Sequence, residues 1–165
     1  MDQPTEGSLQ ALLAIPVAAL GTLHAGAPFV SMVPVALAPG GTGFLIHVSR
    51  LAQHTRDLAS DPRVSLMLMA PLTDQDPLAL PRLSLLGRAE VIAPESGAHA
   101  PAAQAYLARF PQAEVTLGLG DFSFFLIRVE TGRLVSGFGR ALSLEANQIQ
   151  AALARVSRPD ALDIS

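Results

Sequence analysis

The chain contains no cysteine and no tryptophan, and aromatic residues make up only 5% of its 165 residues. The absence of cysteine excludes disulfides, thiolate metal sites and cysteine nucleophiles together. Because aromatic rings are scarce, the core must be mostly aliphatic, and a hydrophobic content of 50% is enough to build it. The length is typical of one domain. We therefore predict a single domain over residues 1–165, with a core of about 16–141.

Charge and long apolar runs are also scarce. The charged fraction is 15%, the net charge is −3, and no basic run is long enough to form a nucleic-acid-binding surface. The acidic, polar N-terminus lacks the features of a secretory signal. A spanning helix needs roughly 18 to 20 apolar residues, and prolines interrupt every candidate, at Pro16, Pro28, Pro34, Pro62, Pro71 and Pro81. We expect a cytoplasmic protein with no nucleic-acid or membrane partner.

Mean hydropathy is nevertheless high for a soluble monomer, at +0.38. Large apolar patches on a protein surface usually mark a contact with another protein or with a membrane. Since no membrane span is present in the sequence, the excess favours burial against a second copy of the chain. We predict a homodimer.

Local patterns predict a mainly β structure. Alternating or apolar runs between turn residues predict strands at 17–24, 29–37, 44–48, 63–70, 82–92, 121–127 and 129–135. Helices are expected at 9–14, from Ser49 to Leu58, at 94–110 and at about 143–156, with residues 1–8 as an arm and with Ser49 and Ser143 as N-caps. We expect Ala25–Pro28 to form a hairpin turn, Thr131–Arg133 a turn or bulge, and Gly87 a bulge. Without βαβ alternation, an antiparallel barrel is favoured over a doubly wound α/β fold.

Polar side chains concentrate between Ile46 and Leu58, where a predicted strand meets a predicted helix. Arg50, Gln53, His54 and Asp57 form one helical stripe, opposite Leu51 and Leu58. The N-terminus of a helix attracts anions because its free N–H groups and its dipole favour negative charge. A solvated polar face explains such a stripe about three times more often than a ligand site does. The pattern alone leaves both interpretations open.

Four stretches resemble the FMN-binding split barrels related to pyridoxamine 5'-phosphate oxidase, and among them the haem-utilisation branch. The resemblance runs from about Pro16 to Ala141. The stretches are Ala27-Pro28-Phe29-Val30-Ser31-Met32-Val33-Pro34, Ser49-Arg50-Leu51-Ala52-Gln53-His54-Thr55 with Leu58, Asp61-Pro62-Arg63-Val64-Ser65-Leu66 and Gly137-Phe138-Gly139-Arg140-Ala141. The second and the fourth are the most specific.

The resemblance implies an antiparallel, Greek-key split β-barrel with peripheral helices, which binds FMN as a homodimer with the cofactor site at the subunit interface. It implies flavin-ring contacts from Ser31, Met32, Val33 and Pro34, and ribityl or phosphate contacts from His47, Val48, Ser49, Gln53, His54 and Thr55. It also implies a contact from Arg82 and a pocket rim of Phe138 and Arg140. Asp57 stands where the family usually has Asn, so we leave it out of the site. His54 stands where related oxidases place a basic residue on the phosphate.

The function implied is an FMN-dependent oxidoreductase acting on an unknown small molecule. One alternative is a haem-binding or haem-degrading protein. Such members take an iron-binding histidine from a C-terminal extension, and this sequence has no histidine after His99. Another alternative is a non-enzymatic flavin or deazaflavin carrier. We expect no metal site, because His24 and His99 have no second histidine three or four residues away. His24 is expected to lie at a hairpin end and His99 on an exposed helix. No hydrolase elbow or nucleotide-binding loop is found.

Overall fold

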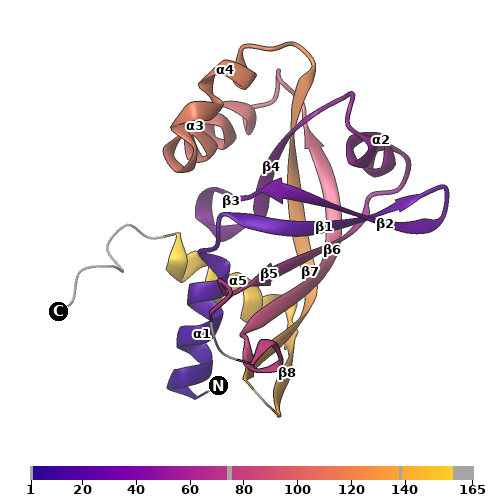
Figure 1. Ribbon diagram of the computed structural model, residues 1–165. Coiled ribbons are helices and arrows are strands. Elements are labelled where there is room, and N and C mark those ends of the chain that lie inside the picture. Colours follow the sequence, from indigo (N-terminus) through magenta and orange to yellow (C-terminus); the bar gives the residue numbers. More distant parts are fainter. Residues whose placement is uncertain (1, 74–75, 138, 158–165) are drawn as a thin grey trace.

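The computed structural model describes residues 2–73, 76–137 and 139–157 (Figure 1). Its strands are β1 (Val17–His24), β2 (Ala27–Pro34), β3 (Ala36–Leu37), β4 (Phe44–Ser49), β5 (Arg63–Met69), β6 (Arg82–Ile92), β7 (Phe122–Gly137) and β8 (Arg140–Glu145). Its α-helices are α1 (Gln3–Leu13), α2 (Gln53–Ser60), α3 (His99–Arg109), α4 (Glu114–Leu117) and α5 (Ala146–Val156).

All strands belong to one sheet with the order β2-β1-β5-β6-β7-β4-β3, and β8 pairs with β7 outside this path. Each paired neighbour is antiparallel. The sheet curls without closing, since β2 and β3 remain at its two edges. Figure 1 shows α3 and α4 at one end of the sheet, α2 beside the β1–β2 hairpin, and α1 and α5 at the other end. The predicted mainly antiparallel split barrel with peripheral helices is confirmed.

Two apolar cores occupy opposite faces of β4 because successive strand residues point to opposite sides. Phe44, Ile46 and Val48 enter the main core, which the curved sheet encloses together with α1 and α5. Leu45 enters a second core beneath α3, where it meets Tyr106 and Phe124. The helical segment between β6 and β7 therefore covers the outer face of β4.

The predicted hairpin and bulge are both present. Ala25 and Gly26 connect β1 to β2 with φ values of 50° and 82°, which suits the two-residue turn that matches strand twist. The pairing of β6 with β7 shifts register between Leu86 and Gly87. A Cβ on Gly87 would overlap the Arg128 carbonyl oxygen, so the two backbones approach there more closely than other residue types allow.

The two strands predicted at 121–127 and 129–135 are one strand, and the turn or bulge predicted at Thr131–Arg133 is a bulge that adjoins Thr131, since Leu86 pairs with Thr131 while Gly87 pairs with Val129. Thr131, Gly132 and Arg133 lie inside the single strand β7, which pairs with β6 on one side. On its other side, β7 pairs first with β4 and then with β8. Two partners along one edge hold the strand extended through Gly132.

Several predicted helix starts were also wrong. Residues 3–8 are helical, because α1 begins after Asp2, whose carboxylate accepts a hydrogen bond of 3.0 Å from the Thr5 N–H. The helix after β4 starts at Gln53 rather than after Ser49. Ser143 lies within β8, and Glu145 caps α5 through a reciprocal pair of hydrogen bonds with Gln148. The predicted end of α2 at Asp61–Pro62 is confirmed.

Candidate functional site

A polar cluster fills the space between the β1–β2 hairpin and α2. We call it the hairpin–helix cluster; its members are Thr22, His24, Ser31, Gln53, His54 and Asp57. Thr22 and His24 share one side of the hairpin because they are spaced by two along β1, and Ser31 on β2 joins them because it pairs with Leu20. Gln53, His54 and Asp57 project from the face of α2 that packs on the hairpin. Gln53 and His54 were predicted as ligand contacts, and the fold turns both toward the hairpin.

Asp57 is the centre of this cluster and is only 3% exposed. Its Oδ2 accepts a hydrogen bond from Thr22 Oγ1 at 3.1 Å, and its Oδ1 accepts one from Gln53 Nε2 at 2.8 Å. The same Oδ1 lies 2.9 Å from Nδ1 of His24. Burial alone would raise the pKa of Asp57, but these hydrogen bonds hold the pKa below its ordinary value. Asp57 therefore faces the hairpin as a buried, hydrogen-bonded carboxylate.

His24 does lie at the hairpin end, as predicted, but it has a structural partner that sequence reasoning missed. Its side chain is 54% exposed while that of Asp57 is 4% exposed. The sequence gives no sign of this pair, because its members are 33 residues apart. The imidazole thus joins the hairpin to α2 while one of its sides remains open to solvent.

Ser31 and His54, both predicted as cofactor contacts, are brought together. Ser31 Oγ lies 3.1 Å from His54 Nδ1. Burial lowers the pKa of His54 below its ordinary value, and the nearby charge of Asp57 only partly opposes this effect. His54 is therefore mainly neutral at pH 7 and supplies hydrogen bonding rather than positive charge.

Ser49 and Thr55 lie where β4 leads into α2. Ser49 Oγ donates a hydrogen bond of 3.0 Å to Asp121 Oδ2 and accepts one of 3.1 Å from the Leu51 N–H. Thr55 is buried, and its hydroxyl donates to the Ser49 carbonyl at 2.6 Å. Asp121, which the sequence analysis did not single out, thus places a carboxylate beside the residue expected to contact a phosphate.

His47 faces the second core rather than the hairpin–helix cluster. Its ring centroid lies 4.3 Å from that of Phe124 and 5.8 Å from that of Tyr106. Burial, and secondarily the charge of His99, lower the pKa of His47. Val33 and Val48 are buried in the main core, so a ligand outside that core can reach only their backbone atoms.

Met32, Pro34 and Arg82 occupy the outer face of the sheet. Several large apolar side chains are exposed on this face across β1, β2, β5 and β6, and together they form what we call the outer apolar face: Val17, Val30, Met32, Met67, Met69 and Leu86, between 40% and 68% exposed. Register places Met32, Ala19 and Met67 in one row across three strands. Arg82 lies at the edge of this face and donates to the Leu80 carbonyl at 3.2 Å.

Arg140 begins β8 at the end of the molecule away from α2, as Figure 1 shows. It shares a hollow of about 420 Å³ with Asp2 and Thr5. Phe138 lies outside the described residues. Within one chain the fold therefore unites Ser31, Gln53 and His54, but it does not bring Arg82 or Arg140 to them.

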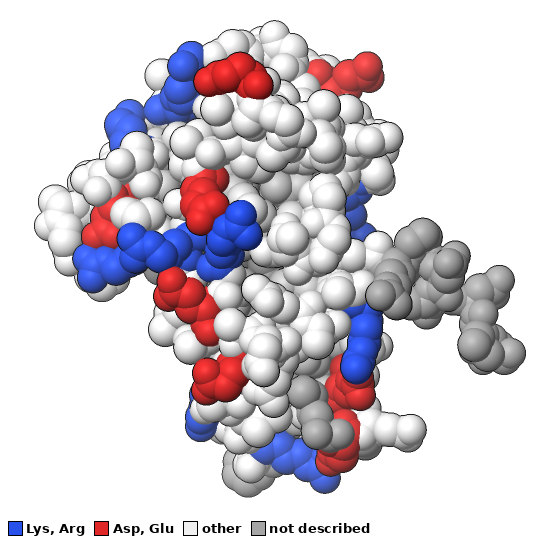
Figure 2. All heavy atoms as spheres, turned by 180° about the vertical axis from the view of Figure 1, so that it is seen from behind, with Lys and Arg blue, Asp and Glu red and all other residues white. Residues whose placement is uncertain are grey.

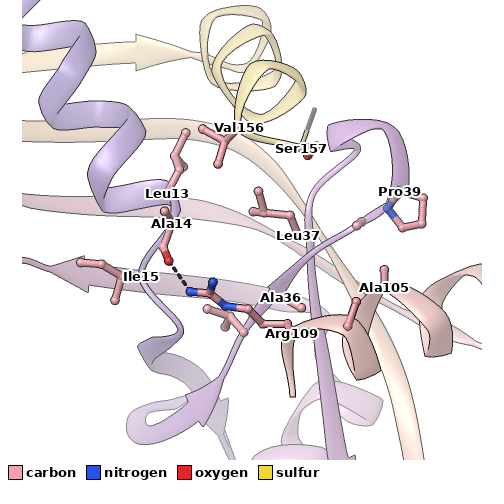
Figure 3. A pocket seen from close by; sticks show the side chains of 13 residues that line it. Leu13, Ala14, Ile15, Ala36, Leu37, Pro39, Ala105, Arg109, Val156 and Ser157 are labelled. Atoms are coloured by element: carbon pink, nitrogen blue, oxygen red, sulfur yellow. Dashed lines mark hydrogen bonds between the residues drawn. The ribbon is translucent and has the colours of Figure 1, made fainter. Parts of the chain in front are cut away.

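A separate cavity of about 400 Å³ lies between the C-terminal ends of α1 and α5, β3 and α3. Figure 3 shows Leu13, Ile15, Leu37 and Val156 around it, with Arg109 extended across it to donate a hydrogen bond to the Ala14 carbonyl. Its wall contains none of the predicted cofactor contacts. Segments far apart in sequence build this cavity, and no local pattern indicates it.

Charged side chains on the face seen in Figure 2 lie in groups of mixed sign. Figure 2, which shows the molecule from behind, has acidic and basic side chains in small mixed groups separated by broad uncharged areas. In the portion of the chain that the structure describes, no helix has the length and apolar character needed to cross a membrane. Nor do three or more His, Asp or Glu side chains of residues 2–73, 76–137 and 139–157 gather in a way that could hold a metal ion.

Comparison with known proteins places this geometry in a family. The family model for pyridoxamine 5'-phosphate oxidase matches residues 5–136. The non-canonical heme oxygenase HOZ of Arabidopsis thaliana is 36% identical over 118 residues, which are 72% of this chain but 35% of that protein. The heme oxygenase HutZ of Vibrio cholerae is 30% identical over 135 residues, or 79% of this chain and 74% of that protein.

A solved structure agrees with these relatives. The heme binding protein from Mycobacterium smegmatis superposes with a TM-score of 0.80 at 34% identity, over 92% of this chain and 61% of that one. The chain thus spans about a third of the Arabidopsis protein and three fifths of the mycobacterial one. From the family match, these relatives and the shared fold, we conclude that the chain belongs to the pyridoxamine 5'-phosphate oxidase-like split-barrel family, in its haem-utilisation branch.

Proposed function

We propose that the protein binds haem as a homodimer, rather than using FMN to oxidise or reduce a small molecule as the sequence led us to expect. The observation that carries this proposal is the charge around the strand–helix junction, where an FMN phosphate is expected. The names of the Arabidopsis, Vibrio and mycobacterial relatives support it. Haem, when bound, would supply the oxygen and electron-transfer chemistry that the side chains lack.

The junction is poorly suited to a phosphate dianion, which is best held by guanidinium or ammonium groups. Asp121 places a carboxylate oxygen 3.0 Å from Ser49 Oγ. The lowered pKa of His54 leaves its ring mainly neutral at pH 7. Arg50 donates to the Gly120 carbonyl and Arg56 to the Leu51 carbonyl, so both nearby cations are already engaged. A phosphate bound at this junction would lie near the Asp121 carboxylate, while the guanidinium groups of Arg50 and Arg56 already donate to backbone carbonyls.

Haem needs mainly apolar surface, and the outer apolar face supplies it. Most of a porphyrin is apolar and needs apolar surface. The exposed methionines and aliphatic residues of β2, β5 and β6 provide such a surface for a second chain and for a ring held between the chains. A second copy would also bring its own Arg82 and Arg140, which lie away from the hairpin–helix cluster within one chain.

Titration of the purified protein with haemin tests this proposal. We expect a Soret band that saturates at about one haem per chain, and light scattering that reports a dimer. FMN added in parallel should keep most of its fluorescence. If haemin gives no saturable band while FMN fluorescence is quenched on binding, the haem proposal is wrong.

FMN binding remains the second candidate, because one specific contact favours it. Ser31 and His54, which the family resemblance assigns to a single ligand, lie 3.1 Å apart. If the protein instead binds FMN, His54→Ala and Ser31→Ala should each weaken FMN binding, whereas Ser143→Ala on β8 should not. Parallel titration with a deazaflavin, followed by a nicotinamide-dependent reduction assay, separates an oxidoreductase from a carrier.

A further inference from the structure

Three arginines stand side by side across the outer face of the sheet. Register pairs Arg63 on β5 with Arg88 on β6, and Arg88 with Arg128 on β7. Directly paired strand residues point to the same side of a sheet, and all three side chains are exposed. We call these residues the arginine row. Within one of the mixed groups of Figure 2, basic side chains form such a row, with acidic side chains on both sides of it.

Two members of the arginine row are neutralised by acids of the same chain. The Asp61 carboxylate accepts a hydrogen bond of 2.6 Å from Arg63 Nη2, and the Glu90 carboxylate accepts one of 2.9 Å from Arg128 Nε. The pKa of Asp61 is lowered to about 2, chiefly by its hydrogen bonds from Arg63, with a smaller contribution from the charge of Arg88. Both acids are therefore bound to the outer members of the row.

Arg88, the middle member, has no acid of its own. In the part of the chain that the structure describes, its guanidinium makes neither a hydrogen bond nor an ion pair. Like charges directly opposite one another destabilise a sheet, so an anion at Arg88 would relieve this repulsion as well as accept hydrogen bonds. The planar fork of a guanidinium matches a carboxylate. The row thus has one position for a carboxylate that the described residues do not supply.

One further acid lies near the arginine row. Glu130 is the extra residue of the bulge in β7, because Leu86 pairs with Thr131 and Gly87 pairs with Val129. Its side chain is exposed, and among the described residues it has no hydrogen-bond or ion-pair partner. Glu130 therefore does not neutralise Arg88, and its charge opposes an anion that approaches the row.

An apolar hollow of about 260 Å³ adjoins the arginine row on the same face, and Arg63 is part of its lining. Across the hollow, register aligns two small residues between two larger ones, in the order Val30, Gly21, Ser65 and Leu86. Arg88 follows Leu86 by two residues along β6, a step of about 7 Å on one face of a strand. A free guanidinium therefore stands beside an apolar hollow.

We propose that Arg88 binds a haem propionate, with the porphyrin ring lying against the hollow beside it. This inference rests on the proposed haem binding and names the residue that would orient the ring. Haem matches the surface because its propionates project from one edge of an otherwise apolar ring, and a few polar groups in an apolar site fix the orientation of a ligand. A second chain packed on the outer apolar face would cover the part of the ring that the hollow leaves exposed.

Haemin and its dimethyl ester separate propionate recognition from apolar binding. The ester keeps the ring and the iron but has no carboxylate. Both compounds are titrated against the full chain in the same buffer, with the Soret band as the signal. The wild-type protein should bind haemin at least about tenfold more tightly than the ester. Arg88→Ala should bind the ester as the wild type does, and should bind haemin no more tightly than the ester.

Arg155→Ala is the matched control. It removes one exposed positive charge from α5, which packs on the main core at the inner side of the sheet. This variant should keep the wild-type preference for haemin over the ester. If it loses that preference as Arg88→Ala does, the preference reflects the net charge of the protein, and the assignment to Arg88 is wrong.

Glu130→Gln gives a test of the opposite sign. It removes the negative charge beside the arginine row, so haemin should bind more tightly, by up to about fivefold. Binding of the ester should not change, because the ester carries no charge for Glu130 to repel. Weaker haemin binding in this variant would contradict the proposal.

Melting of the protein without porphyrin, followed by circular dichroism, tests for a purely structural role of Arg88. Arg88→Gln, which keeps much of the side-chain length, serves as a second variant and should lose the preference for haemin as well. Because either change relieves the repulsion within the row, neither variant should melt well below the wild type. If both do, Arg88 stabilises the sheet, and the proposal is wrong.

The two proposals fail in different ways. If the wild-type protein gives no saturable Soret band with haemin, haem binding is wrong and the role of Arg88 falls with it. If the wild type binds haemin and the ester equally well, or if folded Arg88→Ala keeps the preference, only the role of Arg88 is wrong. If Arg88→Ala is a monomer in light scattering and binds both compounds equally weakly, Arg88 contacts the second chain instead of a propionate.

Discussion

Thr55 joins α2 to the end of β4 through one buried hydroxyl. Its Oγ1 donates to the Ser49 carbonyl at 2.6 Å, and the side chain is 6% exposed. Thr55→Val keeps the shape but leaves the carbonyl without this donor, so we expect a loss of about 1–2 kcal/mol in the free energy of unfolding. Urea denaturation measures this loss.

Thr42→Val is the matched control for Thr55. The Thr42 hydroxyl donates to the Pro39 carbonyl at 3.3 Å in an exposed position. Water can replace that bond, so the change should stay within about 0.5 kcal/mol. Equal losses in the two variants would mean that the junction of β4 and α2 gains nothing from burying its hydrogen bond.

The first hairpin contains a locally strained residue at its turn. Ala25 has a φ of 50°, a conformation that costs an L-residue roughly 1–2 kcal/mol. Ala25→Asn supplies the residue that this two-residue turn prefers before Gly26, so we expect a gain of about 0.5–1 kcal/mol in stability. Thermal or urea denaturation measures it.

Gly26 gives the opposite test of the same turn. A Cβ at this position would meet no atom within 4 Å, so Gly26→Ala changes only the backbone preference at a φ of 82°. It should destabilise the protein by about 1 kcal/mol. A neutral effect would contradict the turn conformation.

The packing of α3 and α4 on β4 depends on a neutral His47. Burial lowers the pKa of His47 from 6.5, so the unfolded chain binds the proton more tightly than the folded chain does. The contribution of neutral His47 to the free energy of unfolding is therefore fully present above about pH 6.5, and it is lost as the pH falls below that value. Melting temperatures between pH 5 and 8 should fall with acidity, and His47→Leu should show a shallower slope. Identical slopes in the two proteins would contradict this account.

At the scale of the whole molecule, the outer apolar face is the surface that the proposed homodimer would bury. Met32 and Met67 lie in one row across the face and are 66% and 40% exposed. Placing charge there should oppose burial against a second chain, because an unpaired buried carboxylate is very costly. Met32→Asp with Met67→Asp should therefore give a monomer in light scattering, with weaker haem binding.

Val115→Asp is the control for the outer apolar face. Val115 is 74% exposed but lies on α4, away from that face. This variant should remain dimeric and bind haem as the wild-type protein does. If it also dissociates, or if the methionine variant stays dimeric, the interface lies elsewhere.

The sequence by itself determined the features that depend on neighbouring residues. Pro16 and the turn at Ala25–Pro28 bounded β1 at its observed ends, Asp61–Pro62 ended α2, and Gly87 marked the bulge. The same local logic failed at helix starts. Ser49 donates to Asp121, 72 residues away, and Ser143 accepts from Arg133 within the β7–β8 pair. A hydroxyl that suits a helix N-cap also suits a sheet or a distant carboxylate, and only the fold decides which partner it meets.

In the candidate site, too, some contacts could be predicted from the sequence and others depend on the fold. Motif resemblance pointed to Ser31 and His54, and the fold brings them together. The pairing of His24 with Asp57 was decided by tertiary structure alone, because it joins a hairpin end to a helix face across 33 residues. Side-chain periodicity reports which face of an element is buried, whereas contacts between elements follow from how the sheet curls and where α2 docks on it.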